Sequence, residues 1–239
     1  MRIAILSDIH GNLTALEAVL ADLRQTSPDL VLHGGDLAEG GPRPCEVVDR
    51  IRELGWPGVL GNTDEMLFRP DSLTEFAARA PKLAPMLAAI EEMGAAAKAA
   101  LGAERLAWLS ALPPVQQHGP VALVHASPGD LWRAPMPDAP DAELVAAYSS
   151  LGRPVAVYGH IHRPFVRAAG GITVANSGSV GLPYDGDQRA SYLLVDGESA
   201  TIRRVAYDVG RELAVLAASG MPHADWVRRM LESARPQPL

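Results

Sequence analysis

Five short apolar runs, each ending in polar side chains, constrain the fold of this 239-residue chain most strongly. Uninterrupted apolar runs of this length are typical of strands that are buried on both faces, as in α/β proteins. In open parallel sheets, ligands bind at the carboxyl ends of such strands. The runs are RIAILSD (2–8), LVLHGGD (30–36), GVLGNTD (58–64), VALVHASP (121–128) and VAVYGH (155–160).

Helical patterns separate the first three runs. Leu13, Leu16, Leu20 and Leu23 share one helical face in residues 12–25, and Asn12 is placed to cap this helix. Residues 44–55 form a second helical pattern that ends at Gly55. The first quarter of the chain therefore reads as β-α-β-α-β, with the third strand ending at Asn62.

The remaining chain divides into a helical part and a part rich in hairpins. Residues 65–112 lack a strand pattern and predict two or three helices, broken near Pro81, Pro85 and Gly94. Residues 165–178 and 190–208 predict two β-hairpins, turning at Gly170-Gly171 and Asp196-Gly197. Two closing helices are expected over 208–218 and 223–234. We therefore expect one domain over 1–239, with 65–112 as a helical insertion.

Charge and composition narrow the classes of partner. The 28 acidic residues exceed the 21 basic ones, for a net charge of −7, which argues against a nucleic-acid groove or an anionic membrane surface. No apolar run reaches the roughly 20 residues of a membrane span. The single cysteine forms no internal disulfide, and the start of the chain does not resemble a signal peptide. A cytoplasmic protein is expected, and its oligomeric state stays open.

The polar residues at the strand ends are all metal-ligand types. Four of the seven histidines lie there, and His160 and His162 point to the same side of an extended segment. Each motif alone has an ordinary explanation, such as a turn or a helix cap. Their joint occurrence at the ends of successive strands predicts one shared metal site. The candidates are Asp8, His10, Asp36, Asn62, His125, His160 and His162.

These motifs resemble, in order, the signature of the calcineurin-like metallophosphoesterases. The matching stretches are SDIHGN (7–12), GGD (34–36), GNTD (61–64), VHASP (124–128) and GHIH (159–162). Residues 176–196 further resemble the small bacterial phosphodiesterase-like branch, with Ser177 in place of its usual proline. The resemblance implies an α/β fold, a four-layer αββα sandwich of two mixed β-sheets flanked by helices.

The resemblance also implies a two-metal site in which Asp36 is shared. Asp8, His10, Asp36 and His162 would hold one ion, and Asp36, Asn62, His125 and His160 the other. Imidazole and carboxylate donors suit manganese, which we expect most, or iron, zinc, cobalt or nickel. A hydroxide bridging two such ions would attack phosphorus in line with the leaving oxygen.

Four further residues are candidates for catalysis or substrate binding. Asp64 would orient a ligand histidine or cap a turn, and it joins Asn62 as a catalytic candidate. The chain N–H groups at Gly11 and Asn12 would face the phosphate, unless Asn12 only caps its helix. Thr63 stands where many relatives carry a histidine that protonates the leaving group. His33 and the loop 185–189 are candidates to replace that acid.

We therefore expect a phosphoesterase that hydrolyses a phosphodiester or an activated phosphomonoester, with a small phosphate ester as partner. A nucleotide is one candidate for that ester. The first alternative is a protein serine/threonine phosphatase, because DIHGN is shared with that branch. The second is a protein-binding scaffold similar to the retromer subunit, in which part of the ligand set is lost. All seven ligand positions are intact here, which favours an enzyme.

Overall fold

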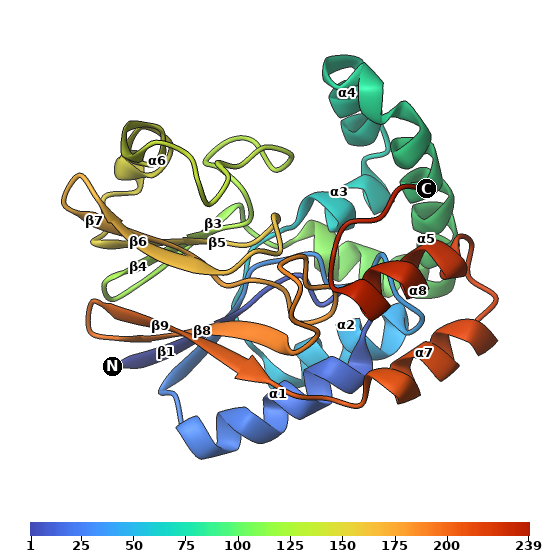
Figure 1. Ribbon diagram of the computed structural model, residues 1–239, viewed down its shortest axis with the longest axis horizontal. Helices are drawn as coiled ribbons and strands as arrows, with labels where there is room; N and C mark the ends of the chain where they lie inside the picture. Colours follow the sequence, from blue (N-terminus) through green and yellow to red (C-terminus); the bar gives the residue numbers. More distant parts are fainter.

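The computed structural model describes residues 1–239 and contains two mixed β-sheets packed face to face (Figure 1). One sheet has the strand order β2-β1-β8-β9 and the other β3-β4-β5-β7-β6. β1 pairs in parallel with β2 and antiparallel with β8, while β5 lies parallel to both β4 and β7. The strands are β1 (Arg2–Leu6), β2 (Leu30–His33), β3 (Val115–His118), β4 (Val121–Val124), β5 (Val155–Tyr158), β6 (Phe165–Ala169), β7 (Ile172–Asn176), β8 (Ala190–Asp196) and β9 (Ser199–Val205).

Three apolar layers hold the sandwich together. Between the sheets, alternate residues of β1, including Ile3 and Ile5, meet Val121 and Val155 of the second sheet. On the outer face of the first sheet, the helices α1 (Leu13–Thr26) and α2 (Pro44–Leu54) bury their apolar sides. On the outer face of the second, α6 (Asp141–Tyr148) buries Leu144 and the ring of its last residue. The expected four-layer αββα arrangement is confirmed.

The prediction of a third strand ending at Asn62 is wrong. Gly58 forms only an isolated bridge to His33, and the chain turns into helix α3 (Asn62–Phe68) at Asn62. Val59 donates to the carbonyl oxygen of His33, but the next amide, of Leu60, donates to Pro113 instead. The run is therefore extended and buried without continuing a ladder, and Asn62 begins a helix rather than ending a strand.

The helical character of 65–112 is confirmed, but its predicted breaks are only partly right. After α3 come α4 (Asp71–Arg79), a short 3-10 turn at Pro81–Leu83, and the long helix α5 (Ala84–Ser110). Pro85 sits in the first turn of α5, where its missing N–H costs nothing. Gly94 lies inside α5 beside Met66, and the only non-helical residue of the helix is Gly102.

Two elements were missed in the sequence, and the closing helices were found. β3 pairs with β4 and ends at His118. α6 begins directly after the proline-rich segment at 134–140. Both hairpins form, although Asp196 pairs with Ser199 and the second turn is therefore at 197–198. The last helices are α7 (Val209–Ala218) and α8 (Ala224–Ser233).

Helices α5, α7 and α8 gather at one end of the sandwich, and the chain terminus returns toward α5 (Figure 1). Ala89 and Met93 of α5 pack with Leu216 of α7 and Trp226 of α8 in a separate apolar cluster. Thr14 of α1 donates to the buried carboxylate of Glu212, which ties α7 to the sandwich. No helix combines the length and apolar character that crossing a membrane would require.

Candidate metal centre

The seven candidate ligands come together where the ends of both sheets meet. Asp8 and His10 follow β1, Asp36 follows β2, and His125 follows β4. The remaining ligands lie after β5, except for Asn62, which opens α3. Six of the seven residues are buried, and His160 is partly exposed. Segments far apart in sequence thus place oxygen and nitrogen donors around one point.

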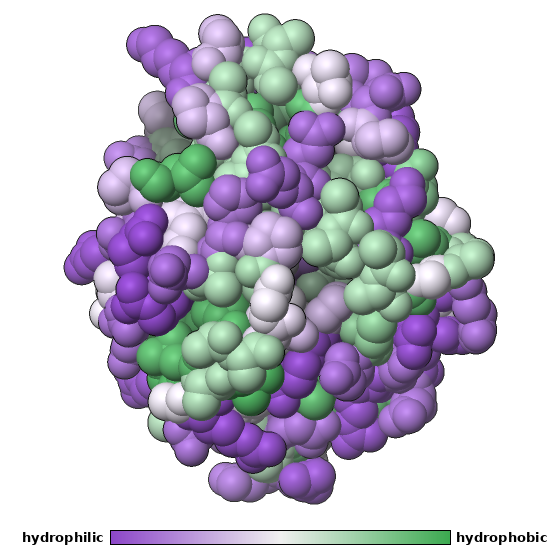
Figure 2. Space-filling model, turned by 90° about the vertical axis from the view of Figure 1, so that its right-hand side faces the viewer, coloured by the Kyte–Doolittle hydropathy of each residue, from purple (hydrophilic) through white to green (hydrophobic).

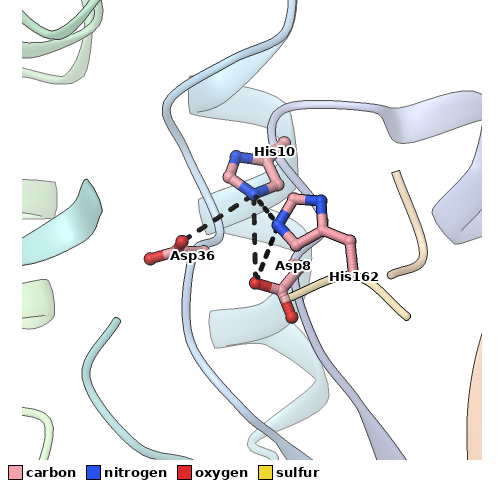
Figure 3. Close-up of side chains that lie close together, drawn as sticks. All are labelled: Asp8, His10, Asp36 and His162. Atoms are coloured by element: carbon pink, nitrogen blue, oxygen red, sulfur yellow. Dashed lines mark hydrogen bonds and ion pairs between the residues drawn. The ribbon is translucent and has the colours of Figure 1, made fainter. Parts of the chain in front are cut away.

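Four of these side chains form a tight cluster (Figure 3). One ligand atom from each of Asp8, His10, Asp36 and His162 lies within 4.8 Å of the others. His162 Nε2 is 3.2 Å from an oxygen of Asp8, and His10 Nε2 is 3.7 Å from Asp36 Oδ2. Two carboxylates and two imidazoles at these separations match the donor set of a transition-metal site.

A second group of donors surrounds the side-chain oxygen of Asn62. This oxygen lies 2.8 Å from His125 Nε2 and 2.9 Å from His160 Nδ1. His125 Nε2 is in turn 3.5 Å from Asp36 Oδ2. The same oxygen of Asp36 therefore faces His10 on one side and His125 on the other, as a shared ligand would.

The hydrogen bonds of three imidazoles indicate that a cation fits between these donors. Nδ1 of His10, His125 and His162 lies 2.6, 2.7 and 2.5 Å from the backbone carbonyls of Glu39, Gly34 and Leu182, respectively. A carbonyl only accepts, so each Nδ1 carries a proton, and each ring in its neutral form presents a bare Nε2 lone pair. His10 Nε2 and His162 Nε2 then face each other at 3.2 Å as two acceptors. A cation satisfies this arrangement, and the residues present fit divalent metal ions.

The pKa values follow from burial and from the crowding of charge. Burial by itself would raise the pKa of Asp8, but the surrounding histidines, His162 foremost, hold it below its usual range. Burial lowers the pKa of His10, and the neighbouring His162 lowers it further. Burial and His125 lower the pKa of His160 to about 4. Asp8 is therefore ionised at neutral pH and His10 and His160 are neutral, which are the forms that bind metal.

The backbone of this region is strained. Five of the eight non-glycine residues with positive φ are candidate ligands, namely Asp8, His10, Asp36, His160 and His162. Such conformations cost free energy and persist where the surrounding structure fixes them, often at functional sites. Two glycines allow the loops to approach. A Cβ on Gly61 would lie 2.1 Å from Asp36 Oδ1, and one on Gly159 2.5 Å from Asp8 Oδ2.

The role expected of Asp64 needs correction. Its carboxylate accepts the backbone N–H groups of Leu37 and Ala38 at 3.1 and 3.3 Å, and it bonds no histidine. Burial and the neighbouring Asp36 raise the pKa of Asp64 to about 7. Asp64 therefore fixes the loop that carries Asp36 instead of orienting a ligand imidazole.

The phosphate contacts expected at Gly11 and Asn12 also need correction. The N–H of Gly11 donates to Leu37, and the N–H of Asn12 donates to Ile9. The side chain of Asn12 caps α1 through Ala15 and donates to Gly181. These groups are already paired within the protein, so Asn12 is a helix cap, the alternative that the sequence left open.

Thr63 does face the site, whereas His33 does not. The backbone N–H of Thr63 donates to Asp36 Oδ1 at 2.9 Å, and its buried hydroxyl has no partner. His33 is fully buried beside Trp108, and burial lowers the pKa of His33 to about 4. A histidine sealed in the core is not available to protonate a leaving group. In the 185–189 loop, Asp185 pairs with Arg204 and Asp187 with Arg189.

Two residues beside the cluster were missed in the sequence. The carbonyl of Glu39 fixes His10, and burial together with Asp36 and Asp64 raises the pKa of its carboxyl to about 8. Tyr184 stacks on His162 with ring centroids 4.4 Å apart. Glu39 lies three residues after Asp36, and Tyr184 lies in the segment 176–196 already singled out. Neither carries a periodic pattern that would have marked it.

Two hollows meet at the candidate ligands. A pocket of about 210 Å³ contains His10, Asp36, Asn62, Thr63, His160 and His162 in its wall. Its outer part is formed by α5, α8 and the segment at Pro236 and Gln237. A wider cleft of about 660 Å³, which includes Phe76 and Trp132, reaches His160 from another side. The donors are thus reachable from outside, although most of them are buried.

Known proteins are similar to this chain in both sequence and fold. The chain matches the calcineurin-like phosphoesterase superfamily domain over residues 1–200. An uncharacterised protein of Methanocaldococcus jannaschii is 30% identical over 96% of each chain. A probable cyclic nucleotide phosphodiesterase of Synechococcus sp. is 29% identical over 70% of this chain and 71% of its own. The crystal structure of a metallophosphoesterase from Sphaerobacter thermophilus superposes with a TM-score of 0.78 at 28% identity, covering 98% of this chain and 99% of that one.

Sequence, fold and the buried cluster of aspartates and histidines thus agree with the resemblance found in the motifs. The domain match covers most of the chain and includes every candidate ligand. A phosphoesterase that hydrolyses phosphoric esters with the help of divalent metal accounts for this donor set. The chain belongs to the calcineurin-like phosphoesterase superfamily.

Proposed function

We propose that this protein is a dinuclear metal-dependent phosphoesterase that hydrolyses a small phosphodiester or an activated phosphomonoester. The observation that carries the proposal is the position of Asp36, whose Oδ2 lies 3.7 Å from His10 Nε2 and 3.5 Å from His125 Nε2. One carboxylate oxygen between two sets of donors is the arrangement expected of a ligand shared by two ions.

The two sets of donors divide as the motifs suggest. Asp8, His10, Asp36 and His162 would hold one ion, and Asp36, Asn62, His125 and His160 the other. We propose manganese for both, since carboxylate and amide oxygens mix here with imidazole. Divalent ions bound there supply Lewis acidity toward the phosphate oxygens and lower the pKa of water to near neutrality.

The chain itself prepares the site for an anion. The bonds from Nδ1 to backbone carbonyls hold three imidazoles with Nε2 directed inward, so little reorganisation is needed. Asp8 and Asp36 are the only carboxylates among the seven ligands, which leaves the loaded centre positive toward a phosphate. Thr63 is a candidate to meet the substrate, because the residue lies in the pocket wall and its buried hydroxyl has no partner within the protein.

The pocket favours a small ester over a phosphoprotein. Residues of α5 and α8 and Gln237 stand over the ligands and leave about 210 Å³, whereas a phosphorylated loop needs a broad open groove. The name of the Synechococcus relative makes cyclic nucleotides substrates to test. We further propose that residues 1–239 act as one domain. The single free cysteine also fits a cytoplasmic location.

The direct test is hydrolysis of bis(p-nitrophenyl) phosphate by protein stripped of metal and then supplied with Mn²⁺. We expect turnover only with metal, and His125→Ala should reduce it at least about 100-fold, since even partners of ligands cost 10–100-fold. His118→Ala is the matched control, because His118 bonds Gln116 away from the cluster. Full activity without metal, or in His125→Ala, would overturn the proposal.

A further inference from the structure

The pocket above the candidate ligands has an apolar outer wall. Met86, Ile90 and Met93 lie at helical spacing on one side of α5 and contribute to it. Trp226 and Met230, one turn apart on α8, complete it. A polar floor of metal-ligand side chains therefore faces an apolar roof built by the two helices. The chemistry of the floor concerns phosphate, so the roof is left for the organic part of the ester.

We propose that this roof is the binding subsite for the alcohol group of the substrate, and that it selects an apolar group about the size of a single ring. The inference rests on the proposed phosphoesterase function and deepens it by naming the class of ester. Phosphate esters of compact aromatic or aliphatic alcohols are the substrates that this subsite fits.

The size of the pocket supports this class. An apolar cavity of about 150 Å³ is enough to hold benzene, and sites for larger ligands measure about 300–1,000 Å³. The volume here is about 210 Å³ and also has to admit the phosphoryl group. One ring therefore fits beside the phosphate within this pocket.

The polar groups of the outer wall are already paired. Trp226 donates its indole N–H to the backbone carbonyl of Gln237 at 2.8 Å. The side-chain amide of Gln237 donates to Ser233 at 2.9 Å, and the hydroxyl of Tyr184 meets the sulfur of Met230 at 3.4 Å. The indole N–H of Trp226 is therefore not free to read the edge of a nucleobase. The three methionines adapt their shape to an apolar ring, because their side chains are flexible and polarisable.

Three residues of the roof offer little apolar surface on the outer face of the molecule. Figure 2 shows the face formed by the end of the sandwich with α5, α7 and α8, where apolar side chains alternate with polar ones. Met93, Trp226 and Met230 are each at most 6% exposed. Most of their apolar surface therefore packs within the cluster formed by α5, α7 and α8, and little of it is available to a protein docked on the face.

The experiment measures binding of phosphonates, which are not hydrolysed, to the Mn²⁺-loaded protein by calorimetry. The series is methyl-, propyl-, phenyl- and biphenylphosphonate, with adenosine monophosphate as the polar aromatic arm. Burial of each methylene should tighten binding about fourfold, which corresponds to about 0.8 kcal/mol. We expect phenylphosphonate to bind at least about tenfold tighter than methylphosphonate, and biphenylphosphonate and adenosine monophosphate to bind no tighter than phenylphosphonate.

Two variants test whether the roof residues cause the tighter binding of phenylphosphonate. Met86 and Ile90 are only half-buried, so Met86→Gln combined with Ile90→Gln keeps helix-forming side chains of similar length without opening the core. This double variant should reduce the gap between phenyl- and methylphosphonate to about threefold or less. Leu106→Gln is the control, because Leu106 is half-buried on the same helix but does not line the pocket.

The outcomes distinguish a failure of the apolar subsite from a failure of the proposed phosphoesterase function. The apolar subsite would be overturned if the double variant kept the wild-type ratio of affinities for phenyl- and methylphosphonate. It would also be overturned if the wild type bound the two equally, or bound adenosine monophosphate more tightly than phenylphosphonate. Metal-dependent hydrolysis of the aryl diester could still hold in each of these cases. If Leu106→Gln also lost the preference for phenylphosphonate, this would count against the subsite, because the preference would then not depend on the roof residues.

Discussion

The Nε2 atoms of His10 and His162 lie 3.2 Å apart, although both rings commit their Nδ1 protons to backbone carbonyls. Two lone pairs directed at each other repel unless a positive charge lies near both. The loops hold them in this position through strained backbone, since both residues have positive φ. With both rings neutral this arrangement is unfavourable, and a bound metal ion would relieve it.

Removing metal should consequently destabilise the protein. An ion that binds only the native state stabilises it by about 2.7 kcal/mol at a concentration 100 times its dissociation constant. Differential scanning calorimetry should show a lower Tm after chelation and recovery on adding Mn²⁺. His162→Ala should weaken this response, while His223→Ala, in which the lost histidine only pairs with Glu92 on the surface, should keep it. The same Tm with and without confirmed metal loss would contradict a preformed site.

Without metal, stability should fall as pH rises from about 6.5 to 8.5. Burial together with Asp36 and Asp64 raises the pKa of Glu39 from its ordinary 4.5 to about 8. The folded state therefore holds a proton that the unfolded state has lost, and this stabilisation disappears as pH passes through about 8. The buried histidines with lowered pKa act in the opposite direction, but below about 6.5.

Urea unfolding of the metal-free protein at the two pH values measures this effect. Glu39 alone should account for a loss of about 2 kcal/mol over the window. Glu39→Gln should remove that part of the slope, because its amide does not ionise. Glu91→Gln, which changes an exposed glutamate on α5, is the control and should leave the slope unchanged. A wild type equally stable at both pH values would show that Glu39 is not held protonated.

Thr63 leads to a prediction about leaving groups. A threonine hydroxyl has no useful acidity, and His33 is sealed in the core, so the expected replacement for the missing histidine is not available. Aryl esters should turn over well and alkyl esters poorly, with a gap of at least about 10²–10⁴-fold, the usual worth of general acid catalysis. Thr63→His should speed the alkyl esters selectively. Rates of wild type that do not depend on leaving-group pKa would contradict this account.

Much of the fold could be predicted because its elements are local and apolar. The buried strands β1, β2, β4 and β5 read directly as apolar runs, and Asn12 and Gly55 marked the ends of helices by their capping chemistry. The run at 58–61 was misread because an extended buried segment has the composition of a strand, whether or not a neighbour continues its ladder. β3 was missed because VQQH is short and polar.

The metal-ligand residues of the candidate site could be predicted from the sequence, but the residues that hold them in place could not. Histidines and aspartates at strand ends can be recognised directly in the sequence. The partners of Asp64 and Gly11 depend on loops that meet only in three dimensions, so the roles of these two residues were misjudged, whereas the helix cap at Asn12 was one of the two alternatives that the sequence offered. The helical roof of the pocket brings together residues 86–93 and 226–230, and no sequence spacing links these segments.

The shared position of Asp36 is the central claim, and metal content tests it most directly. Protein reconstituted with Mn²⁺ and freed of excess ion should contain two ions per chain. Asp36→Ala should retain none, whereas Asp64→Asn, which changes a neighbouring buried acid that only accepts backbone N–H groups, should retain both. Circular dichroism would establish that each variant is folded. A folded Asp36→Ala variant that still binds two ions, or a wild type that binds only one, would contradict the claim.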